Sequence, residues 1–376
     1  MSRPQLLIVS FSTLESDPRV LKQIDALRDR YDISTCGYGP APKGIGTHYR
    51  IPDDRVYWRY PRPAVMARLY GRAYRANPVV SWVRDTLPDA TFDVVLANDI
   101  DAVGAALELH PRFGVHADLH EFAPLQNTEL LRFRLFVAPF MRWQLRTFAR
   151  RADSVSTVAP TIAMRLRDEF GLDPFVVMNA PPLADLPITP TGVPIRLVHA
   201  GAALRNRRLE DLITAMELLN DAGNFTLDMY LAANDPEYLR SLKARADAVP
   251  GVRVLAPVPF EDLIPTLNGY DIGLHLLAPT NFNNAYALPN KFFEYVQARL
   301  GVVIGPSPEM ARILQTHGFG AIAGDFSAAA LAETLRGVDQ ATVLQWKTAA
   351  DASAPELSAQ LQTRAWVSAI DAIAGE

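Results

Sequence analysis

The sequence predicts an α/β protein of two domains, each built around a mainly parallel β-sheet. Three observations indicate this fold class. Short apolar runs alternate with segments of helical periodicity in both halves of the chain. A proline-rich segment, residues 180–194, separates the two halves. The length of 376 residues suits two domains that each bury a core of their own.

Each half contains six apolar runs that predict strands. The runs are mostly continuous rather than alternating with polar residues, which is typical of strands covered on both faces, as in parallel sheets. The expected strands of the first half are residues 6–11, 33–37, 94–97, 115–119, 155–158 and 176–178, and those of the second half are 197–199, 227–232, 252–256, 272–276, 302–304 and 321–323. Helices of the second half are expected to begin near Leu209, Pro236, Phe260, Pro289, Pro308 and Ala328.

The linker sets the predicted domain boundary. Five prolines within fifteen residues prevent both helix and sheet, so we expect one domain over residues 1–185 and a second over residues 186–376. Ligands of parallel sheets bind beyond the carboxyl ends of the strands, and a cleft between the two domains is the expected site. The helical spacing of residues 344–374 predicts C-terminal helices that pack back on either domain.

Composition excludes several classes of protein. The single cysteine, Cys36, allows no disulfide and no cysteine-based metal site within one chain. No stretch of about 18 apolar residues predicts a membrane-spanning helix, and the start of the chain shows no export signal. We therefore expect a cytoplasmic protein. A location at the inner face of the cell membrane is the alternative.

The net charge of −4 conceals an asymmetry between the halves. Residues 1–185 carry 23 basic and 21 acidic side chains, whereas the remainder is acidic. Residues 55–84 contain seven arginines and residues 130–151 contain six, and neither segment contains an acidic residue. Aromatic residues lie between these arginines at helical spacing, so the two segments predict either membrane-surface helices or ordinary helices with apolar residues inside and arginines in water. Nucleic-acid binding is disfavoured because the protein is acidic overall and contains no recognised nucleic-acid module.

The segment from Leu288 to Tyr295 is the strongest candidate for a binding site. Pro289 suits a first helical position, and Lys291 then lies in the first turn with Glu294 one turn later on nearly the same face. A helix N-terminus together with a lysine binds anions, and a neighbouring carboxylate accepts hydrogen bonds from hydroxyl groups. An exposed ion pair between Lys291 and Glu294 is the alternative explanation.

A second candidate lies between His199 and Glu210. A strand that ends in Gly201, followed by a loop and a helix from Leu209, places backbone N–H groups and arginines at the carboxyl edge of the sheet. That arrangement favours a diphosphate, with Arg207 as the cation. We expect Arg205 and Arg208 to be solvated.

Polar residues at the ends of predicted strands mark a candidate site in the first half. Asp118-Leu119-His120-Glu121 ends one strand, and Asn98-Asp99-Ile100-Asp101 ends another. The latter contains an Asp-x-Asp pattern, but we expect Asp101 to cap a helix and predict no metal and no other cofactor. Asp17 and Pro18 have the spacing of a helix N-terminus, which leaves Arg19 as the site candidate there.

Together these segments resemble family 4 glycosyltransferases, which are retaining enzymes of the GT-B fold that use nucleotide-sugar donors. The resemblance extends along nearly the whole chain, from Ser16–Val20 through Asp118–Glu121 and Gly201 to residues 288–295 and 318–320. It implies that Glu294 holds the ribose, that Arg207 and Lys291 bind the diphosphate near Gly201, and that His120 contacts the transferred sugar.

One departure from the pattern concerns the sugar. Many members of the family have a second glutamate eight positions before Glu294, where this chain has Tyr286. The preceding loop is similar to that of a subgroup with Asn and Tyr before Leu-Pro-Asn-Lys, so Asn283, Asn284 and Tyr286 become candidates for neutral hydrogen bonds to the sugar. A polar turn without such a role is the alternative.

The sequence therefore predicts a glycosyltransferase that moves a sugar from an NDP-sugar to a saccharide or lipid-linked acceptor, with retention, in building a cell-surface glycan. We expect the acceptor on the first domain, near Arg19, Asp99 and Glu121, and no nucleic-acid partner. Nucleophile motifs are absent from the sequence, so catalysis is expected to rest on positioning and charge stabilisation. A sugar-nucleotide epimerase of the same fold and a non-catalytic sugar-binding protein are the alternatives.

Overall fold

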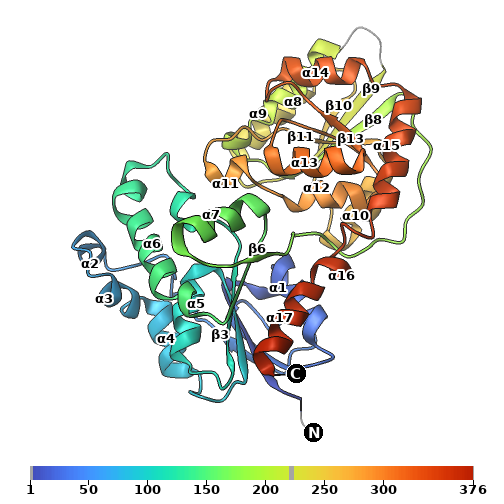
Figure 1. Ribbon diagram of the computed structural model, residues 1–376. Coiled ribbons are helices and arrows are strands. Elements are labelled where there is room, and N and C mark those ends of the chain that lie inside the picture. Colours follow the sequence, from blue (N-terminus) through green and yellow to red (C-terminus); the bar gives the residue numbers. More distant parts are fainter. Residues whose placement is uncertain (1–2, 220–223, 376) are drawn as a thin grey trace. The chain divides into compact units, whose positions relative to one another are not determined.

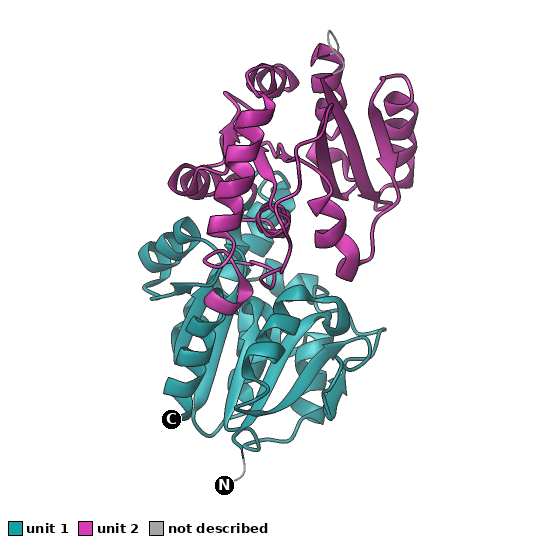
Figure 2. Cartoon of the chain, turned by 90° about the vertical axis from the view of Figure 1, so that its right-hand side faces the viewer, with its two compact units in different colours: residues 1–178, 281–283, 362–376 teal, residues 179–280, 284–361 magenta. Residues whose placement is uncertain are grey.

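The computed structural model describes residues 3–219 and 224–375, and it confirms two parallel-sheet α/β units. Figure 1 shows the order of the elements, and Figure 2 shows the two units in separate colours. Unit 1 comprises residues 1–178, 281–283 and 362–376. Unit 2 comprises residues 179–280 and 284–361.

Unit 1 contains a seven-stranded sheet in the order β3-β2-β1-β4-β5-β6-β7, in which every described pair of strands runs parallel. Its strands are β1 (Gln5–Thr13), β2 (Asp32–Tyr38), β3 (Thr47–Arg50), β4 (Val94–Asn98), β5 (Gly114–Leu119), β6 (Ser154–Thr157) and β7 (Phe175–Val176). Its helices are α1 (Pro18–Leu27), α2 (Arg62–Met66), α3 (Tyr70–Arg75), α4 (Pro78–Thr86), α5 (Asp99–Glu108), α6 (Ala138–Thr147), α7 (Pro160–Phe170) and α17 (Arg364–Ala374), with a π-helical turn, η3 (Phe133–Val137), before α6.

Unit 2 contains a six-stranded parallel sheet in the order β10-β9-β8-β11-β12-β13. Its strands are β8 (Ile195–Ala202), β9 (Phe225–Ala232), β10 (Val252–Leu255), β11 (Ile272–His275), β12 (Gly301–Ile304) and β13 (Gly320–Ile322). The helices after the linker are α8 (Glu210–Leu219), α9 (Pro236–Ala246), α10 (Phe260–Asn268), α11 (Phe282–Ala285), α12 (Asn290–Gln297), α13 (Pro308–His317), α14 (Ala328–Arg336), α15 (Gln340–Ser353) and α16 (Ala359–Gln362). Within each sheet the strands are parallel, so their carboxyl ends lie along one edge of that sheet, and the candidate residues lie at these edges.

The compact units differ from the predicted division in two ways. The linker residues hydrogen bond to unit 2: the Ala184 N–H donates to Gln297 Oε1, and the Thr189 hydroxyl donates to the Asn268 carbonyl, so the chain enters unit 2 at residue 179 rather than 186. The C-terminal helix α17 belongs to unit 1. Its Ile370 packs in the same apolar cluster as Ile24 of α1, because an amphipathic helix must cover its apolar face.

Local capping was predicted in part. Asp17 caps α1 as expected, since its carboxylate accepts the N–H groups of Arg19 and Val20. The expectation that Asp101 caps α5 is wrong. The helix starts two residues earlier, so Asp101 lies within the first turn and accepts a hydrogen bond from the Tyr60 hydroxyl at 2.6 Å. Among the described residues every helix is too short or too polar to span a membrane.

Candidate active site

A cluster of basic side chains lies at the carboxyl edge of the unit 2 sheet. Gly201, near the end of β8, lies directly against it: a Cβ atom on this residue would stand 2.7 Å from Lys291 Nζ and 3.6 Å from an Arg207 guanidinium nitrogen. A side chain at this position would displace the Lys291 ammonium group from the end of the strand, whereas glycine leaves room for it beside Arg207. The structure brings together the three residues that the sequence proposed for the diphosphate.

Lys291 is buried in this cluster. Its side chain is hydrogen bonded to His199, with Nζ 3.3 Å from Nε2, and His199 Nδ1 donates to the Leu274 carbonyl at 2.9 Å. Burial, reinforced by the charge of Arg207 and opposed by that of Glu294, lowers the pKa of Lys291 to about 7. The neighbouring His199 stays neutral at pH 7, because burial and the Lys291 charge hold its pKa well below the usual value.

The three arginines of this loop have different partners. Arg205 is exposed and pairs with Asp235 and Glu237, and Arg208 is exposed and pairs with Asp211. Arg207 is half-buried and has no ion pair or hydrogen bond from its side chain within the described residues. It therefore remains available to an anionic ligand.

The backbone of Arg208 has the left-handed φ of 49°, a conformation that glycine reaches without strain. The Arg208 side chain is largely exposed and pairs with Asp211.

Sequence reasoning missed a second histidine at this edge. His275 ends β11 beside β8, its side chain is buried, and neither of its ring nitrogens has a hydrogen-bond partner among the described residues. Burial, followed by the charges of Lys291, His199 and Arg207, keeps the pKa of His275 well below its usual value. A signal was present, because His275 ends β11 and His199 lies three residues before the end of β8, and a parallel sheet places these two strands side by side.

The other donor-side candidates fall into two groups. Glu294 lies one turn after Lys291 on α12 and is buried, in agreement with the predicted shared face. Asn284 lies in the short helix α11, where its amide donates to the Thr280 hydroxyl at 2.6 Å, and Tyr286 lies in the turn directly after this helix. Hydrogen bonds from Asn284 and Tyr286 to the donor sugar stay a prediction.

Asn283, predicted to hydrogen bond to the donor sugar, has its side-chain amide engaged within unit 1. It belongs to unit 1, where its side-chain oxygen accepts the Phe122 N–H at 3.0 Å and its amide nitrogen donates to the Phe122 carbonyl and to Glu121 Oε2. The amide group of Asn283 is therefore used to anchor its own loop, which the sequence could not show because the partner lies 161 residues away.

In unit 1 the polar residues at the ends of β4 and β5 form one network. Arg19 is 2% exposed and makes two hydrogen bonds to Asp118, at 2.6 and 2.7 Å, and its guanidinium lies 4.6 Å from the Trp366 ring of α17. Burial alone would raise the pKa of Asp118, but Arg19 and His120 outweigh it and hold this pKa well below the usual value. Arg19, predicted as an acceptor residue, is thus a buried structural residue.

His120 lies at the open end of this network. Its Nε2 is 3.1 Å from Asn98 Oδ1 and 3.4 Å from Asp118, and its Nδ1 is 3.4 Å from Asp99. Burial would lower the pKa of His120, but the carboxylates of Asp99 and Asp118 more than compensate, so the pKa is raised and the protonated form is favoured. The predicted residues His120 and Asp99 are therefore in contact.

The Asp99 backbone has the left-handed φ of 63°. A non-glycine residue in this region is strained, and such strain concentrates at functional sites.

Glu121, the remaining acceptor candidate, accepts hydrogen bonds from Gln126 and Asn283.

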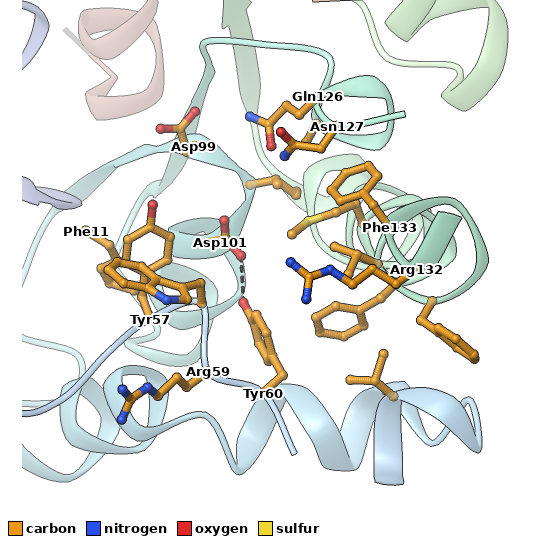
Figure 3. Close-up of a pocket in the computed structure, with 18 of the residues that line it drawn as sticks. Phe11, Tyr57, Arg59, Tyr60, Asp99, Asp101, Gln126, Asn127, Arg132 and Phe133 are labelled. Carbon is orange, nitrogen blue, oxygen red and sulfur yellow. Dashed lines mark hydrogen bonds between the residues drawn. The ribbon is translucent and has the colours of Figure 1, made fainter. Parts of the chain in front are cut away.

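A cavity of about 1110 Å³ opens in unit 1 beside Asp99. Its lining residues all belong to the first 141 residues, and Figure 3 shows Asp101 and Tyr60 hydrogen bonded on one wall with Arg132 facing them across the space. Burial and the Asp99 charge raise the pKa of Asp101 to about 6, although hydrogen bonds from Tyr60 and Gln144 oppose the shift. This cavity was not predicted from the sequence, since its walls come from four segments that are far apart along the chain, residues 10–12, 57–66, 98–101 and 123–141.

Comparisons with known proteins identify the fold. No protein-family model matches the chain, and no curated protein matches it. Among solved structures, it is similar to a glycosyltransferase from Rickettsia africae (TM-score 0.70, 11% identity, 99% of each chain covered). It is also similar to an α,α-trehalose-phosphate synthase (UDP-forming) from Burkholderia vietnamiensis (TM-score 0.70, 12% identity, covering 99% of this chain and 98% of the other). A third similar structure is the Anabaena protein HepE in complex with UDP-glucose (TM-score 0.66, 16% identity, covering 97% of this chain and 99% of the other). The chain therefore has the GT-B fold of these glycosyltransferases.

Proposed function

We propose that the protein is a glycosyltransferase that takes a sugar from an NDP-sugar bound by unit 2 and transfers it to a saccharide or lipid-linked acceptor bound by unit 1. The observation that supports this most is the cluster of Gly201, Arg207 and Lys291, where two cations approach a glycine at the edge of a parallel sheet. Similar structures include enzymes whose names or ligands specify UDP and UDP-glucose. This makes a uridine nucleotide the first donor to test.

The proposed reaction depends on stabilising the negative charge of the leaving diphosphate. When the bond between the anomeric carbon and the diphosphate breaks, negative charge grows on the departing phosphate oxygens. Arg207 and protonated Lys291 stabilise that charge in a partly buried site, where electrostatic interactions are stronger than in water. Glu294 remains the proposed partner of the ribose hydroxyls, and His120 the proposed partner of the transferred sugar. We also propose retention of anomeric configuration and a role in cell-surface glycan synthesis.

Product analysis tests the transferase assignment. Purified protein is incubated with UDP-sugars and other NDP-sugars, with and without candidate acceptors, and the nucleotide products are separated. A transferase releases nucleoside diphosphate in an acceptor-dependent manner, and the configuration of its product tests retention. An altered sugar nucleotide without acceptor identifies an epimerase, and an unchanged donor that nevertheless binds identifies a sugar-binding protein.

The affinity for the NDP-sugar is expected to fall as the pH rises from 6 to 8.5. Lys291 has a pKa of about 7 in the free protein, so its positive charge is present below this pH and is lost above it. The loss approaches about tenfold per pH unit if only the charged form binds. Calorimetry across this range checks the slope, and Lys291→Arg, which keeps its charge, should flatten it. An affinity that is constant or rises with pH would show that Lys291 does not bind the phosphates.

We propose that the reaction needs no metal ion. Within the described residues no group of three or more His, Cys, Asp or Glu side chains is arranged to hold one, and Arg207 and Lys291 supply positive charge beside Gly201. Activity is accordingly expected to be unchanged by excess EDTA. Activity that EDTA abolishes and Mn²⁺ restores would contradict this proposal.

We propose a peripheral contact with an anionic membrane through the exposed arginines Arg68, Arg72 and Arg75 around α3. The second arginine-rich segment is less available, because Arg142 pairs with Glu169 and the Trp143 ring packs on Tyr70. Each exposed basic residue near an anionic surface contributes about 1 kcal/mol. The protein should therefore float with anionic vesicles at low salt and be released by high salt, whereas no flotation at low salt would refute the contact.

A further inference from the structure

The cavity of unit 1 has largely apolar walls. Six of its larger side chains are aromatic or aliphatic: Tyr57, Trp58, Leu130, Phe133, Phe136 and Met141. They come from the segment before α2, from the residues around η3 and from α6. Trp58 is 67% exposed and Leu130 is 41% exposed, so apolar surface is already presented to solvent and would be covered by a bound ligand.

One cation points into this apolar space. Figure 3 shows the Arg132 guanidinium directed toward Asp101 and Tyr60, whereas Arg59 is directed away from the centre. The Arg132 side chain makes no ion pair or hydrogen bond within the described residues. An arginine held without a partner beside apolar walls is suited to an anionic group, which its planar guanidinium binds through two hydrogen bonds.

The acidic groups of the cavity have partners of their own. Asp101 accepts the Tyr60 hydroxyl at 2.6 Å, and Asp99 lies 3.4 Å from His120 Nδ1. The carboxylates of Asp99 and Asp118 in turn raise the pKa of His120. Arg59 and Arg62 also line the cavity, but Arg132 is the labelled arginine that Figure 3 shows directed into it, and the polar end of the cavity lies next to the proposed sugar-binding residue.

A saccharide can stack its C–H faces on the aromatic rings, but its hydroxyl groups find no hydrogen-bond partner against aliphatic side chains such as Leu130 and Met141. A ligand with an apolar chain and one anionic group matches them better. We propose that this cavity binds a lipid phosphate, with its hydrocarbon chain against Leu130, Phe133 and Phe136 and its phosphate on Arg132. The inference rests on the proposed function in that it names the acceptor as a lipid-linked one.

Alkyl phosphates of increasing chain length test the cavity directly. Binding of hexyl, octyl and decyl phosphate is measured by calorimetry below their critical micelle concentrations, with inorganic phosphate and maltose as comparisons. Each added methylene that is buried should tighten binding about threefold to fourfold. Inorganic phosphate should bind far more weakly than decyl phosphate. Equal affinity across the chain lengths, or maltose binding more tightly than decyl phosphate, would overturn the proposal.

Two pairs of variants locate the binding. Leu130→Asp places a charge in the cavity wall, and Leu131→Asp places the same charge on a neighbour that is 60% exposed and outside the lining. Arg132→Ala removes the proposed phosphate partner, and Arg134→Ala removes an exposed arginine of η3 that does not line the cavity. We expect Leu130→Asp and Arg132→Ala each to weaken decyl phosphate binding about tenfold or more, and the two controls to leave it unchanged.

Equal losses in the variants and in their controls would mean adsorption to the general surface and would refute the site. All four positions are exposed and lie outside the ion pairs of the described residues, and circular dichroism verifies that each variant is folded. The assay contains no nucleotide-sugar, so its result is independent of unit 2. Failure here with intact UDP-sugar binding refutes only the lipid acceptor, whereas absence of NDP-sugar binding with alkyl phosphate binding intact refutes the proposed transfer.

Discussion

Replacing Arg207 with alanine is expected to lower kcat/KM for the NDP-sugar by about 10² to 10³, the usual loss when one preorganised donor to a developing anion is removed. Arg207 is half-buried, and its guanidinium lies beside Gly201 with Lys291 Nζ on the same side. Its charge is not neutralised by an ion pair in the described part of the protein. Removing its guanidinium therefore takes a direct electrostatic interaction away from the departing diphosphate.

Arg205→Ala is the matched control for this experiment. It removes the same charge two residues away, but Arg205 is exposed and already paired with Asp235 and Glu237. We expect its kinetics to stay close to those of the wild type. Steady-state kinetics with the preferred donor distinguish the two variants, and Glu294→Ala should also weaken donor use strongly. Near-normal turnover in both Arg207→Ala and Glu294→Ala would refute the donor site.

Arg19→Ala is expected to destabilise unit 1 by about 3 to 5 kcal/mol, because it leaves the Asp118 carboxylate buried without its partner. The Asp118 side chain is fully buried, and the substitution also removes the contact of the guanidinium with the Trp366 ring. Hydrogen exchange of the β5 and β6 amides reports this loss for unit 1 alone, which global unfolding of a two-unit chain does not.

A surface ion pair provides the comparison. Arg28, at the end of α1, pairs with Asp25, and both side chains are largely exposed. Arg28→Ala should therefore leave exchange in β5 nearly unchanged. If the amides of β5 are as well protected from exchange in Arg19→Ala as in the wild type, the Arg19–Asp118 pair contributes little to stability. Arg19 would then again be a candidate for binding the acceptor.

The same ion pair predicts an acid limit to stability. Arg19 holds the pKa of Asp118 well below its usual value in the folded protein. The pair therefore stabilises unit 1 fully above the unfolded pKa of about 3.9, and this contribution is lost as the pH falls through the lower folded value. The Arg19→Ala variant lacks this contribution at every pH.

Local patterns in the sequence predicted most of the fold. Eleven of the strands that appear in the two sheets coincide with continuous apolar runs, and Pro308 and Ala328 begin helices where expected. The edge strand β3 (Thr47–Arg50) was missed because its residues are polar and partly exposed. The run at 176–178 only overlaps the two-residue strand β7: the Val177 N–H still donates to the Thr157 carbonyl of β6, but the Val177 carbonyl accepts a hydrogen bond from Arg19.

The site was predictable where its residues are close in sequence or follow a motif. Gly201, Arg207 and Lys291 meet because parallel topology brings the strand end and the helix start to one edge. Arg19 was misplaced because its burial depends on Asp118 and Trp366, which are far away along the chain. The hydrogen bonds of Asn283 to Phe122 were not predicted for the same reason, because a hydrophilic residue of this kind carries no local sign of its distant partner.

The most direct test of the account is a binding screen of nucleotide-sugars, read out by thermal shift and confirmed by calorimetry, on the wild type and on Arg207→Ala. The cation cluster of unit 2 predicts that at least one NDP-sugar stabilises the wild-type protein, with UDP-glucose the first to examine, and that Arg207→Ala loses most of that affinity. Binding that is unaffected by the substitution, or no binding of any NDP-sugar by the folded wild type, would contradict the central claim that this cluster holds the diphosphate of a glycosyl donor.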